Sequence, residues 1–254
     1  MDIQILGTYP GELSQRFILT TYIINGELAI DAGAIGLGLT VAEQKRIQNI
    51  LITHTHIDHL ATLPIFIDNR WSDSTPPPVI HATAHNLAMV RKHLFNNVLW
   101  PELQNISDHF FTLHDVEPYR TVELDHFNFY LFPVNHPVPT YGILLEEKAT
   151  RSQVLFTSDT TICDVIWIEA NRSPRLKAIF SEISFPDAYL DLAQSAGHLT
   201  PKLLERELRK LKKPVPIYLT HYKNQHVEQI EREIAGLSGP RMRIARAGEM
   251  IHIE

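Results

Sequence analysis

Short runs in which apolar residues alternate with polar ones, or stand together, dominate the beginning and the middle of the chain. Runs of this length predict β-strands, half-buried where the residues alternate and fully buried where they do not. Strands are expected at residues 2–7, 20–25, 28–31, 49–53, 76–82, 109–116, 127–136, 140–147, 153–159, 178–185 and 216–221. Elsewhere apolar residues recur every three or four positions, which indicates amphipathic helices. Helices are expected at residues 40–48, 83–97, 200–211 and 224–237.

Two of the predicted helices begin with recognisable capping residues. Thr40 precedes the first helix and Glu43 follows three positions later, which is the capping-box pattern. Thr200 precedes Pro201 at the start of the third helix, and proline is favoured at the first helical position. Both starting points therefore have a signal that is independent of apolar periodicity.

The predicted elements come in a repeating order: strands, then alternating strands and helices, then strands, then alternation again. This order predicts an α/β fold in which two sheets pack back to back with helices outside, a four-layer αββα sandwich. Periodicity alone does not separate this arrangement from a doubly wound parallel sheet. A chain of 254 residues is long enough for one large core, and no linker divides it. We therefore expect a single domain over residues 1–254.

Composition and charge exclude several classes of protein. Hydrophobic residues make up 44% of the chain and charged residues 20%, as in ordinary globular proteins. The net charge of −6 argues against a broad cationic surface, so a nucleic-acid partner is not expected. The single cysteine, Cys163, excludes an internal disulfide and suits a reducing compartment. The first residues show no signal-peptide pattern, and no apolar stretch reaches the roughly 18 residues of a membrane span. We expect a cytoplasmic protein without a membrane partner.

The segment LITHTHIDHL, residues 51–60, places three histidines and an aspartate within six positions, directly after an apolar run. In an extended chain His54 and His56 point the same way and can converge on one metal ion. Asp58 and His59 follow at the turn into the next helix and face a second point nearby. Imidazole and carboxylate groups are suitable ligands for zinc and related ions. One segment cannot complete two coordination shells, so further ligands are expected at the ends of other strands.

The carboxyl ends of three predicted strands carry residues of metal-binding type, namely His136, Asp159 and His221. Together with the H-x-H-x-D-H motif at 54–59, this order resembles the metallo-β-lactamase superfamily, and DAG at 31–33 is similar to its early glycine turn. The resemblance runs from the first strand to His221 and implies that fold.

The resemblance also implies two divalent metal ions, with zinc favoured and manganese or iron as alternatives. The implied ligands are His54, His56 and His136 for the first ion, Asp58, His59 and His221 for the second, and Asp159 as the bridge. Two such ions, about 3.5–4 Å apart, activate water and stabilise the entering and leaving oxygens in a hydrolytic reaction.

A second motif lies in SEISFPDAYLDLAQSAGHLTP, residues 181–201. Glu182 and the Gly-His-Leu-Thr-Pro stretch that carries His198 resemble the phosphodiesterase branch of the superfamily, which includes tRNA 3′-processing endonucleases and class II cyclic-nucleotide phosphodiesterases. The resemblance implies that His198, oriented by Glu182, lies over the phosphate as a general acid or a phosphate clamp. A departing alkoxide needs such a proton. We expect Asp58, His198 and Glu182 to be essential for catalysis.

The stretches HIDHLATLPIFIDN, VNHPVPTYG and FTSDTT are most similar to bacterial class II 3′,5′-cyclic-nucleotide phosphodiesterases. The implied reaction is hydrolysis of cAMP or cGMP to the 5′-nucleotide. The residues leave open whether the cyclic nucleotide carries a purine or a pyrimidine.

Three other functions remain possible. A tRNA 3′-processing endonuclease would need a basic arm, whereas the longest basic cluster, residues 206–213, is interrupted by leucines and is more simply a solvated helix face. A lactonase or thioesterase would share the metal pair without requiring Glu182 and His198. A metal-bound sensor that is not an enzyme would keep the ligands without turnover. The segment from Leu94 to Phe111 is expected to form a homodimer surface, a wall of the substrate pocket, or part of the core.

Overall fold

The computed structural model describes residues 1–7, 19–72, 75–103, 109–237 and 241–254. Within these ranges the chain divides into two compact units, each built around one seven-stranded sheet. The N-terminal unit comprises residues 2–117 and 247–252, and the C-terminal unit comprises Met1, residues 118–246 and residues 253–254. Two mixed sheets accompanied by helices confirm the predicted α/β class.

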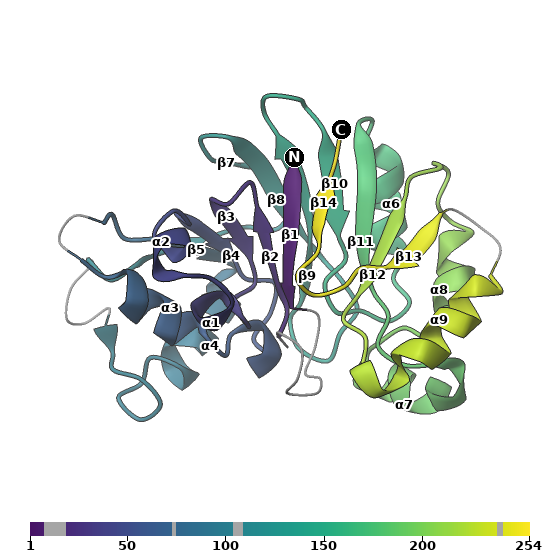
Figure 1. The fold of residues 1–254 in the computed structure, drawn as a ribbon, viewed down its shortest axis with the longest axis horizontal. Helices are drawn as coiled ribbons and strands as arrows, with labels where there is room; N and C mark the ends of the chain where they lie inside the picture. The colour runs from purple at the N-terminus through teal and green to yellow at the C-terminus, as the bar shows by residue number, and fades with distance from the viewer. Residues whose placement is uncertain (8–18, 73–74, 104–108, 238–240) are drawn as a thin grey trace. The chain divides into compact units, whose positions relative to one another are not determined.

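The sheet of the N-terminal unit has the strand order β14-β1-β2-β3-β4-β5-β6 (Figure 1). Its strands are β1 (Asp2–Gly7), β2 (Thr21–Ile24), β3 (Leu28–Ile30), β4 (Asn49–Leu51), β5 (Val79–Ala82), β6 (Thr112–Asp115) and β14 (Met250–His252). Strands β14 to β3 pair antiparallel, whereas β3 to β6 pair parallel. The parallel strands consequently bring the segments that follow them to the same edge of the sheet.

In the part of the chain that the structure describes, this sheet is accompanied by the helices α1 (Ile35–Gly38), α2 (Val41–Gln44), α3 (Leu63–Arg70) and α4 (Ala84–His93) and by the 3₁₀ turn η1 (Ile57–His59). Phe66 of α3 and Val90 of α4 are buried in one cluster with Ile50 and Ile80 of the central strands. Both helices therefore cover the same face of the sheet, because alternate strand residues point to one side.

The sheet of the C-terminal unit has the order β13-β12-β11-β10-β9-β8-β7. Its strands are β7 (Val122–Glu123), β8 (Phe127–Pro133), β9 (Tyr141–Glu147), β10 (Gln153–Phe156), β11 (Leu176–Glu182), β12 (Ile217–Thr220) and β13 (Met242–Ile244). Strands β7 to β10 pair antiparallel and β10 to β13 pair parallel. This unit therefore repeats the mixed pattern of the first.

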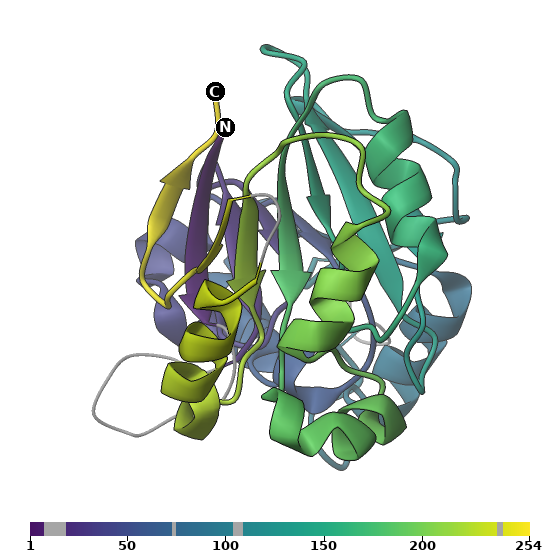
Figure 2. The ribbon, with the colours of Figure 1, turned by 90° about the vertical axis from the view of Figure 1, so that its right-hand side faces the viewer.

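Helices α6 (Asp164–Arg172), α8 (Pro201–Leu208) and α9 (Val227–Ala235) lie over one face of this sheet (Figure 2). Trp167, Leu204 and Ile230, one from each helix, are buried in a cluster with Ile179 and Leu219 of the sheet. The remaining elements are α7 (Leu190–Ala196) and the 3₁₀ turns η2 (Asp187–Tyr189) and η3 (Asn224–His226). None of the helices in the described ranges combines the length and the apolar character that crossing a bilayer requires.

Both predicted capping signals are confirmed. The hydroxyl of Thr40 accepts from the amide of Glu43, whose carboxylate accepts from the amide of Thr40, and the hydroxyl of Thr200 accepts from the amide of Leu203. The helix expected at 40–48 nevertheless ends at Gln44. The buried Gln44 side chain donates to the carbonyl oxygens of Gly36 and Leu39 and so ties the end of this short helix to the preceding segment.

Helices α3, α6 and α7 are not predicted by the sequence pattern. Helix α3 has eight residues, and its buried face includes the charged Arg70 whereas the apolar Ile65 is only partly buried, so its apolar residues show little periodicity. Helix α6 is also short, although Ile166, Trp167 and Ala170 follow helical spacing. Windows this short do not separate a helix from an irregular segment.

Candidate functional site

In the N-terminal unit the predicted ligand segment follows β4 and is fixed by backbone contacts to the segment that follows β3 and to the residue before β2. The amide of Ala32 donates to the carbonyl oxygen of His59 at 2.7 Å, and the amide of Thr20 donates to that of Asp58 at 3.0 Å. A Cβ at Gly33 would lie 2.0 Å from the Asp58 carbonyl oxygen, so only glycine allows this approach. The DAG motif thus has a physical function, which is to let the loop of η1 pack directly against the end of β3.

Asp31, the first residue of that motif, determines which ring nitrogen of two histidines carries hydrogen. Its carboxylate accepts from His59 Nδ1 at 2.7 Å and from the Thr53 hydroxyl at 2.8 Å. Because the single Thr53 hydrogen is donated to Asp31, the Thr53 oxygen accepts from Nδ1 of His54, 3.1 Å away. His54 and His59 therefore both carry hydrogen on Nδ1, and their Nε2 atoms present the lone pairs.

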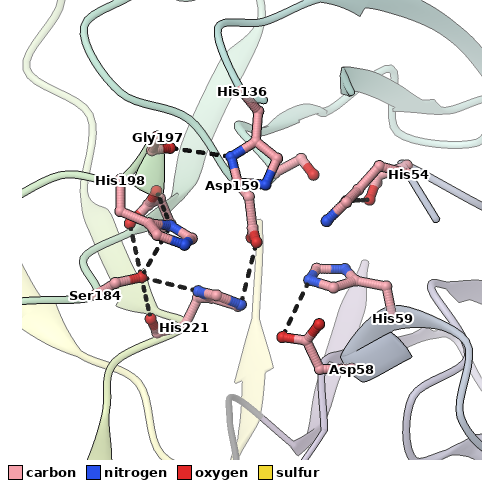
Figure 3. A network of polar contacts seen from close by, with 12 residues as sticks. His54, Asp58, His59, His136, Asp159, Ser184, Gly197, His198 and His221 are labelled. Carbon is pink, nitrogen blue, oxygen red and sulfur yellow. Dashed lines mark hydrogen bonds and ion pairs between the residues drawn. The ribbon is translucent and has the colours of Figure 1, made fainter. Parts of the chain in front are cut away.

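The donor chemistry of this segment fits a divalent cation. The rings of His54 and His59 lie 4.0 Å apart between centroids, and their Nε2 atoms are buried. Ligand atoms of His54 and His56 lie within 4.8 Å of each other, and His59 Nε2 is 3.8 Å from Asp58 Oδ2 (Figure 3). Neutral imidazoles oriented through Nδ1, next to a carboxylate, are the usual arrangement around zinc.

The C-terminal unit brings together the other three predicted ligands. Asp159 follows β10, His136 follows β8 and His221 follows β12. His221 Nε2 lies 3.3 Å from Asp159 Oδ2, and ligand atoms of His136 and Asp159 lie within 4.8 Å of each other (Figure 3). Asp159 and His221 are almost completely buried. These residues also fit a metal ion, because carboxylate and imidazole atoms converge in a region with little access to water.

The orientation of His136 depends on the Gly-His-Leu-Thr-Pro stretch. His136 Nδ1 lies 3.0 Å from the carbonyl oxygen of Gly197, which can only accept, so Nδ1 carries the hydrogen and Nε2 the lone pair. Gly197 has φ +76°, and a Cβ there would lie 2.4 Å from Pro137 Cδ and 2.9 Å from His136 Nδ1. Glycine is therefore required both by the backbone conformation and by the space that His136 occupies.

His198 and Glu182 form the hydrogen-bonded pair that the sequence predicts. His198 Nδ1 lies 2.9 Å from Glu182 Oε1, and the buried carboxylate also accepts from the amides of Thr160 and Leu199. Burial by itself lowers the pKa of His198, but the charge and hydrogen bond of Glu182, with the charge of Asp159, outweigh it, so the pKa lies above its ordinary value. His198 can therefore hold a proton on Nε2, the nitrogen that does not face Glu182.

Three residues at the strand ends have backbone conformations that are unfavourable for side chains other than glycine. Asp31, Ser158 and His221 have φ values of +58°, +56° and +56°. Each such conformation costs on the order of 1–2 kcal/mol. Strain of this kind concentrates where a site requires a particular side-chain direction.

Every sequence-predicted site residue thus lies in one of two sets, each within its own unit. His54, His56, Asp58 and His59 form the first set, and His136, Asp159, Glu182, His198 and His221 form the second. Pattern reasoning missed Asp31, Thr53, Ser184 and Gly197, which orient these side chains. The DAG and Gly-His-Leu-Thr-Pro motifs contain two of them, so a signal existed for Asp31 and Gly197.

Comparisons with known proteins place the chain in a family and identify its fold. A family model described as anti-Pycsar protein Apyc1 matches residues 1–238. A probable 3′,5′-cyclic-nucleotide phosphodiesterase of Yersinia pestis is 22% identical over 81% of this chain and 74% of its own length. The crystal structure of unliganded yeast PDE1 superposes with a TM-score of 0.80, at 17% identity, over 98% of both chains. The metallo-β-lactamase fold protein YhfI of Bacillus subtilis gives 0.77, also at 17% identity and over 98% of both chains.

The structural likeness confirms the predicted metallo-β-lactamase fold. The sequence relative supports the phosphodiesterase branch and the hydrolase class that the resemblance implied.

Proposed function

We propose that this chain, which belongs to the anti-Pycsar protein Apyc1 family, is a metal-dependent phosphodiesterase. Its proposed substrates are 3′,5′-cyclic nucleotides, with cAMP and cGMP as first candidates, and its proposed products are 5′-nucleotides. The observation that carries the proposal is the pair formed by His198 and Glu182, which lies beside Asp159 and His221 in the C-terminal unit. A proton donor at such a position suits an alkoxide leaving group. The name of the Yersinia pestis relative agrees with this substrate class.

We propose that the two ligand sets bind two divalent ions within one hydrolase domain over residues 1–254. The proposed ligands are His54, His56 and His136 for one ion and Asp58, His59 and His221 for the other, with Asp159 shared. Support comes from the donor chemistry of each set and from the Nδ1 contacts that orient His54, His59 and His136. Two divalent ions would supply an activated water and neutralise charge on the phosphate, with zinc favoured over manganese or iron.

The residues of this chain then have distinct tasks. His198 donates its Nε2 proton to the departing ribose 3′-oxygen. Glu182 holds Nδ1 of His198 and offsets the positive charge of the imidazolium. Asp58, with 17% of its side chain exposed, is more accessible to solvent than His54 and His59.

Two observations argue against a tRNA endonuclease. The net charge is −6, and several cations of the basic cluster at 206–213 have partners within the C-terminal unit. Lys210 Nζ lies 2.6 Å from Asp164 and Arg209 lies 3.9 Å from Glu205, while Lys213 donates to the carbonyl oxygen of Ala170 at 3.2 Å. These contacts support the prediction that the cluster is a solvated helix face.

We also infer a cytoplasmic homodimer. Cys163 is a buried free thiol, which suits a reducing compartment. In the segment from Leu94 to Phe111, whose residues 104–108 lie outside the described ranges, four side chains are buried in the core, which was one of the expected alternatives: Leu94, Phe95, Leu103 and Phe111. Val98 and Leu99 are 85% and 66% exposed, and the dimer inference rests on these two side chains. Light scattering of the protein and of a Val98→Asp, Leu99→Asp variant tests this inference. A wild-type monomer would exclude it.

The decisive experiment for the function uses the full-length protein loaded with zinc or manganese. It is incubated separately with cAMP, cGMP, cCMP, cUMP, a cyclic dinucleotide, a precursor tRNA and a lactone, and the products are identified by liquid chromatography. We expect 5′-nucleotide from at least one cyclic mononucleotide. Asp58→Ala should remove this activity, whereas Asp68→Ala, an exposed aspartate on α3, should retain it.

The other outcomes separate the alternative functions. Cleavage restricted to precursor tRNA or to the lactone would replace the proposed substrate with that one. Tight binding of a nucleotide without product would indicate a sensor. Activity of Asp58→Ala equal to that of Asp68→Ala would refute the assignment of the metal ligand.

A further inference from the structure

Ser184 is a buried serine, 1% exposed, that follows β11. It lies between the pair of His198 and Glu182 and the proposed ligand His221. Its backbone position is fixed, because its amide donates to the carbonyl oxygen of Leu199 and its own carbonyl oxygen accepts from the amide of Lys223. No motif in the sequence assigned it a role.

The Ser184 oxygen makes four polar contacts within the C-terminal unit (Figure 3). It lies 3.0 Å from Glu182 Oε2 and 2.8 Å from the carbonyl oxygen of His221. It also lies 2.9 Å from His221 Nδ1 and 3.2 Å from His198 Nδ1. A single hydroxyl thus connects the acidic residue, the predicted proton donor and a predicted metal ligand.

The number of available hydrogens determines which atom donates and which accepts in each contact. The carboxylate and the carbonyl oxygen can only accept, so the one hydroxyl hydrogen of Ser184 is directed to one of these two oxygens. The two imidazole nitrogens that face Ser184 must then be the donors. His198 and His221 therefore both carry hydrogen on Nδ1, which leaves Nε2 of His221 as a lone pair and Nε2 of His198 as the site of the transferable proton.

We propose that Ser184 is a positioning residue that fixes the Nδ1–H tautomer of His221 and, together with Glu182, holds the Nδ1 side of His198, so that one hydroxyl helps to orient both the proposed proton donor and a proposed metal ligand. This inference rests on the proposed function for the task of His198, but the claim about His221 concerns the protein's own geometry. Contacts of this kind around metal ligands typically change metal affinity or activity by about 10–100-fold.

The test compares Ser184→Ala with Ser181→Ala. Ser181, on β11, is fully buried, and its hydroxyl donates only to the carbonyl oxygen of Glu182, at 3.2 Å, so its loss removes a buried hydroxyl without touching an imidazole. Both variants are smaller than the wild type and create no steric clash. Ser184→Thr is the conservative variant that keeps the oxygen.

Three readouts are measured on the zinc-loaded, full-length protein. The first is retention of zinc during titration with a competing chelator, and the second is the imidazole Nδ1–H signal of His221 in ¹⁵N-histidine NMR spectra. The third is the ratio of kcat on a cyclic nucleotide to kcat on bis(p-nitrophenyl) phosphate, whose good leaving group needs little proton donation.

We expect Ser184→Ala to lose one zinc ion at a chelator concentration about 10–100-fold lower than the wild type requires. The Nδ1–H signal should lose its protection from solvent exchange, and the kcat ratio should fall. Ser184→Thr should recover these properties, and Ser181→Ala should match the wild type. Ser184→Ala that matches Ser181→Ala in zinc retention and NMR would overturn the proposal. If the wild type cleaves no phosphodiester, these two readouts still decide the role of Ser184, so failure of the two proposals is distinguishable.

Discussion

Replacing Gly197 by alanine should both strain a left-handed backbone position and displace His136, a proposed metal ligand. The added Cβ would lie 2.4 Å from Pro137 Cδ, whereas carbon atoms in contact are about 3.5 Å apart, so one of the two groups must move by about 1 Å. His136 must move as well, because its Nδ1 would lie only 2.9 Å from the new Cβ. A displacement of this size at a reacting site can reduce the rate by about 100-fold.

Gly248 provides the matched control for this change. It has φ +84°, and a Cβ added there would meet nothing within 4 Å, so Gly248→Ala incurs the backbone cost alone, about 1–2 kcal/mol. Gly197→Ala should lose this amount and a further ~1–3 kcal/mol from overpacking. Urea unfolding gives both free energies of unfolding, and elemental analysis gives the zinc content. We expect zinc loss in Gly197→Ala only. Equal destabilisation of the two variants, with full zinc content in both, would refute the coupling of Gly197 to His136.

Three further changes address other parts of the molecule. In Asp31→Asn the side-chain amide can donate to His59 Nδ1, so the hydrogen of His59 should move to Nε2 and zinc affinity should fall by about 10–100-fold. Unchanged zinc retention in a chelator titration would contradict this. His198→Ala should retain both ions but lose about 10²–10⁴-fold in kcat on a cyclic nucleotide, with a much smaller loss on a nitrophenyl ester. Burial, with the neighbouring His114, lowers the pKa of His81 to about 3. Between about pH 3 and 6.5 the unfolded chain therefore binds a proton at this histidine that the folded chain does not. The free energy of unfolding consequently falls as the pH decreases through this range. In His81→Gln this pH-dependent decrease, of the order of several kcal/mol, should be absent when free energies of unfolding are compared across that range.

The strands were the most predictable part of the fold. Runs such as those of β8 and β9 bury alternating or consecutive apolar residues, and that burial pattern follows directly from the residue types. Helices α8 and α9 were also predicted, because their apolar faces repeat over more than two turns and α8 has a Thr200 cap. The short helix α3 was not predictable, since its eight residues are determined by packing on β4 and its neighbours rather than by a period of their own.

The candidate site likewise contains some residues that the sequence could predict and others that it could not. Residues with chemically distinctive side chains, such as His54 and Asp159, stand out in the sequence because histidine and aspartate rarely follow apolar runs in groups. Ser184 and Thr53 do not stand out, because buried serine and threonine are common and most serve only local hydrogen bonds. Their roles depend on contacts across 37 positions for Ser184 and His221, and 22 positions for Thr53 and Asp31. No local pattern in a single sequence contains that information.

The orienting contacts have a common chemical consequence that supports a metal-binding role better than any single distance. Four predicted ligands have Nδ1 engaged by an oxygen acceptor: His54 by Thr53, His59 by Asp31, His136 by Gly197 and His221 by Ser184. The acceptors differ in kind, being hydroxyl, carboxylate and backbone carbonyl, and they come from separate segments of two units. If these histidines had only structural roles, nothing would favour the same tautomer at every position. A cation bound through Nε2 does require it, because each ligand nitrogen must present a lone pair while its other nitrogen is held by an acceptor.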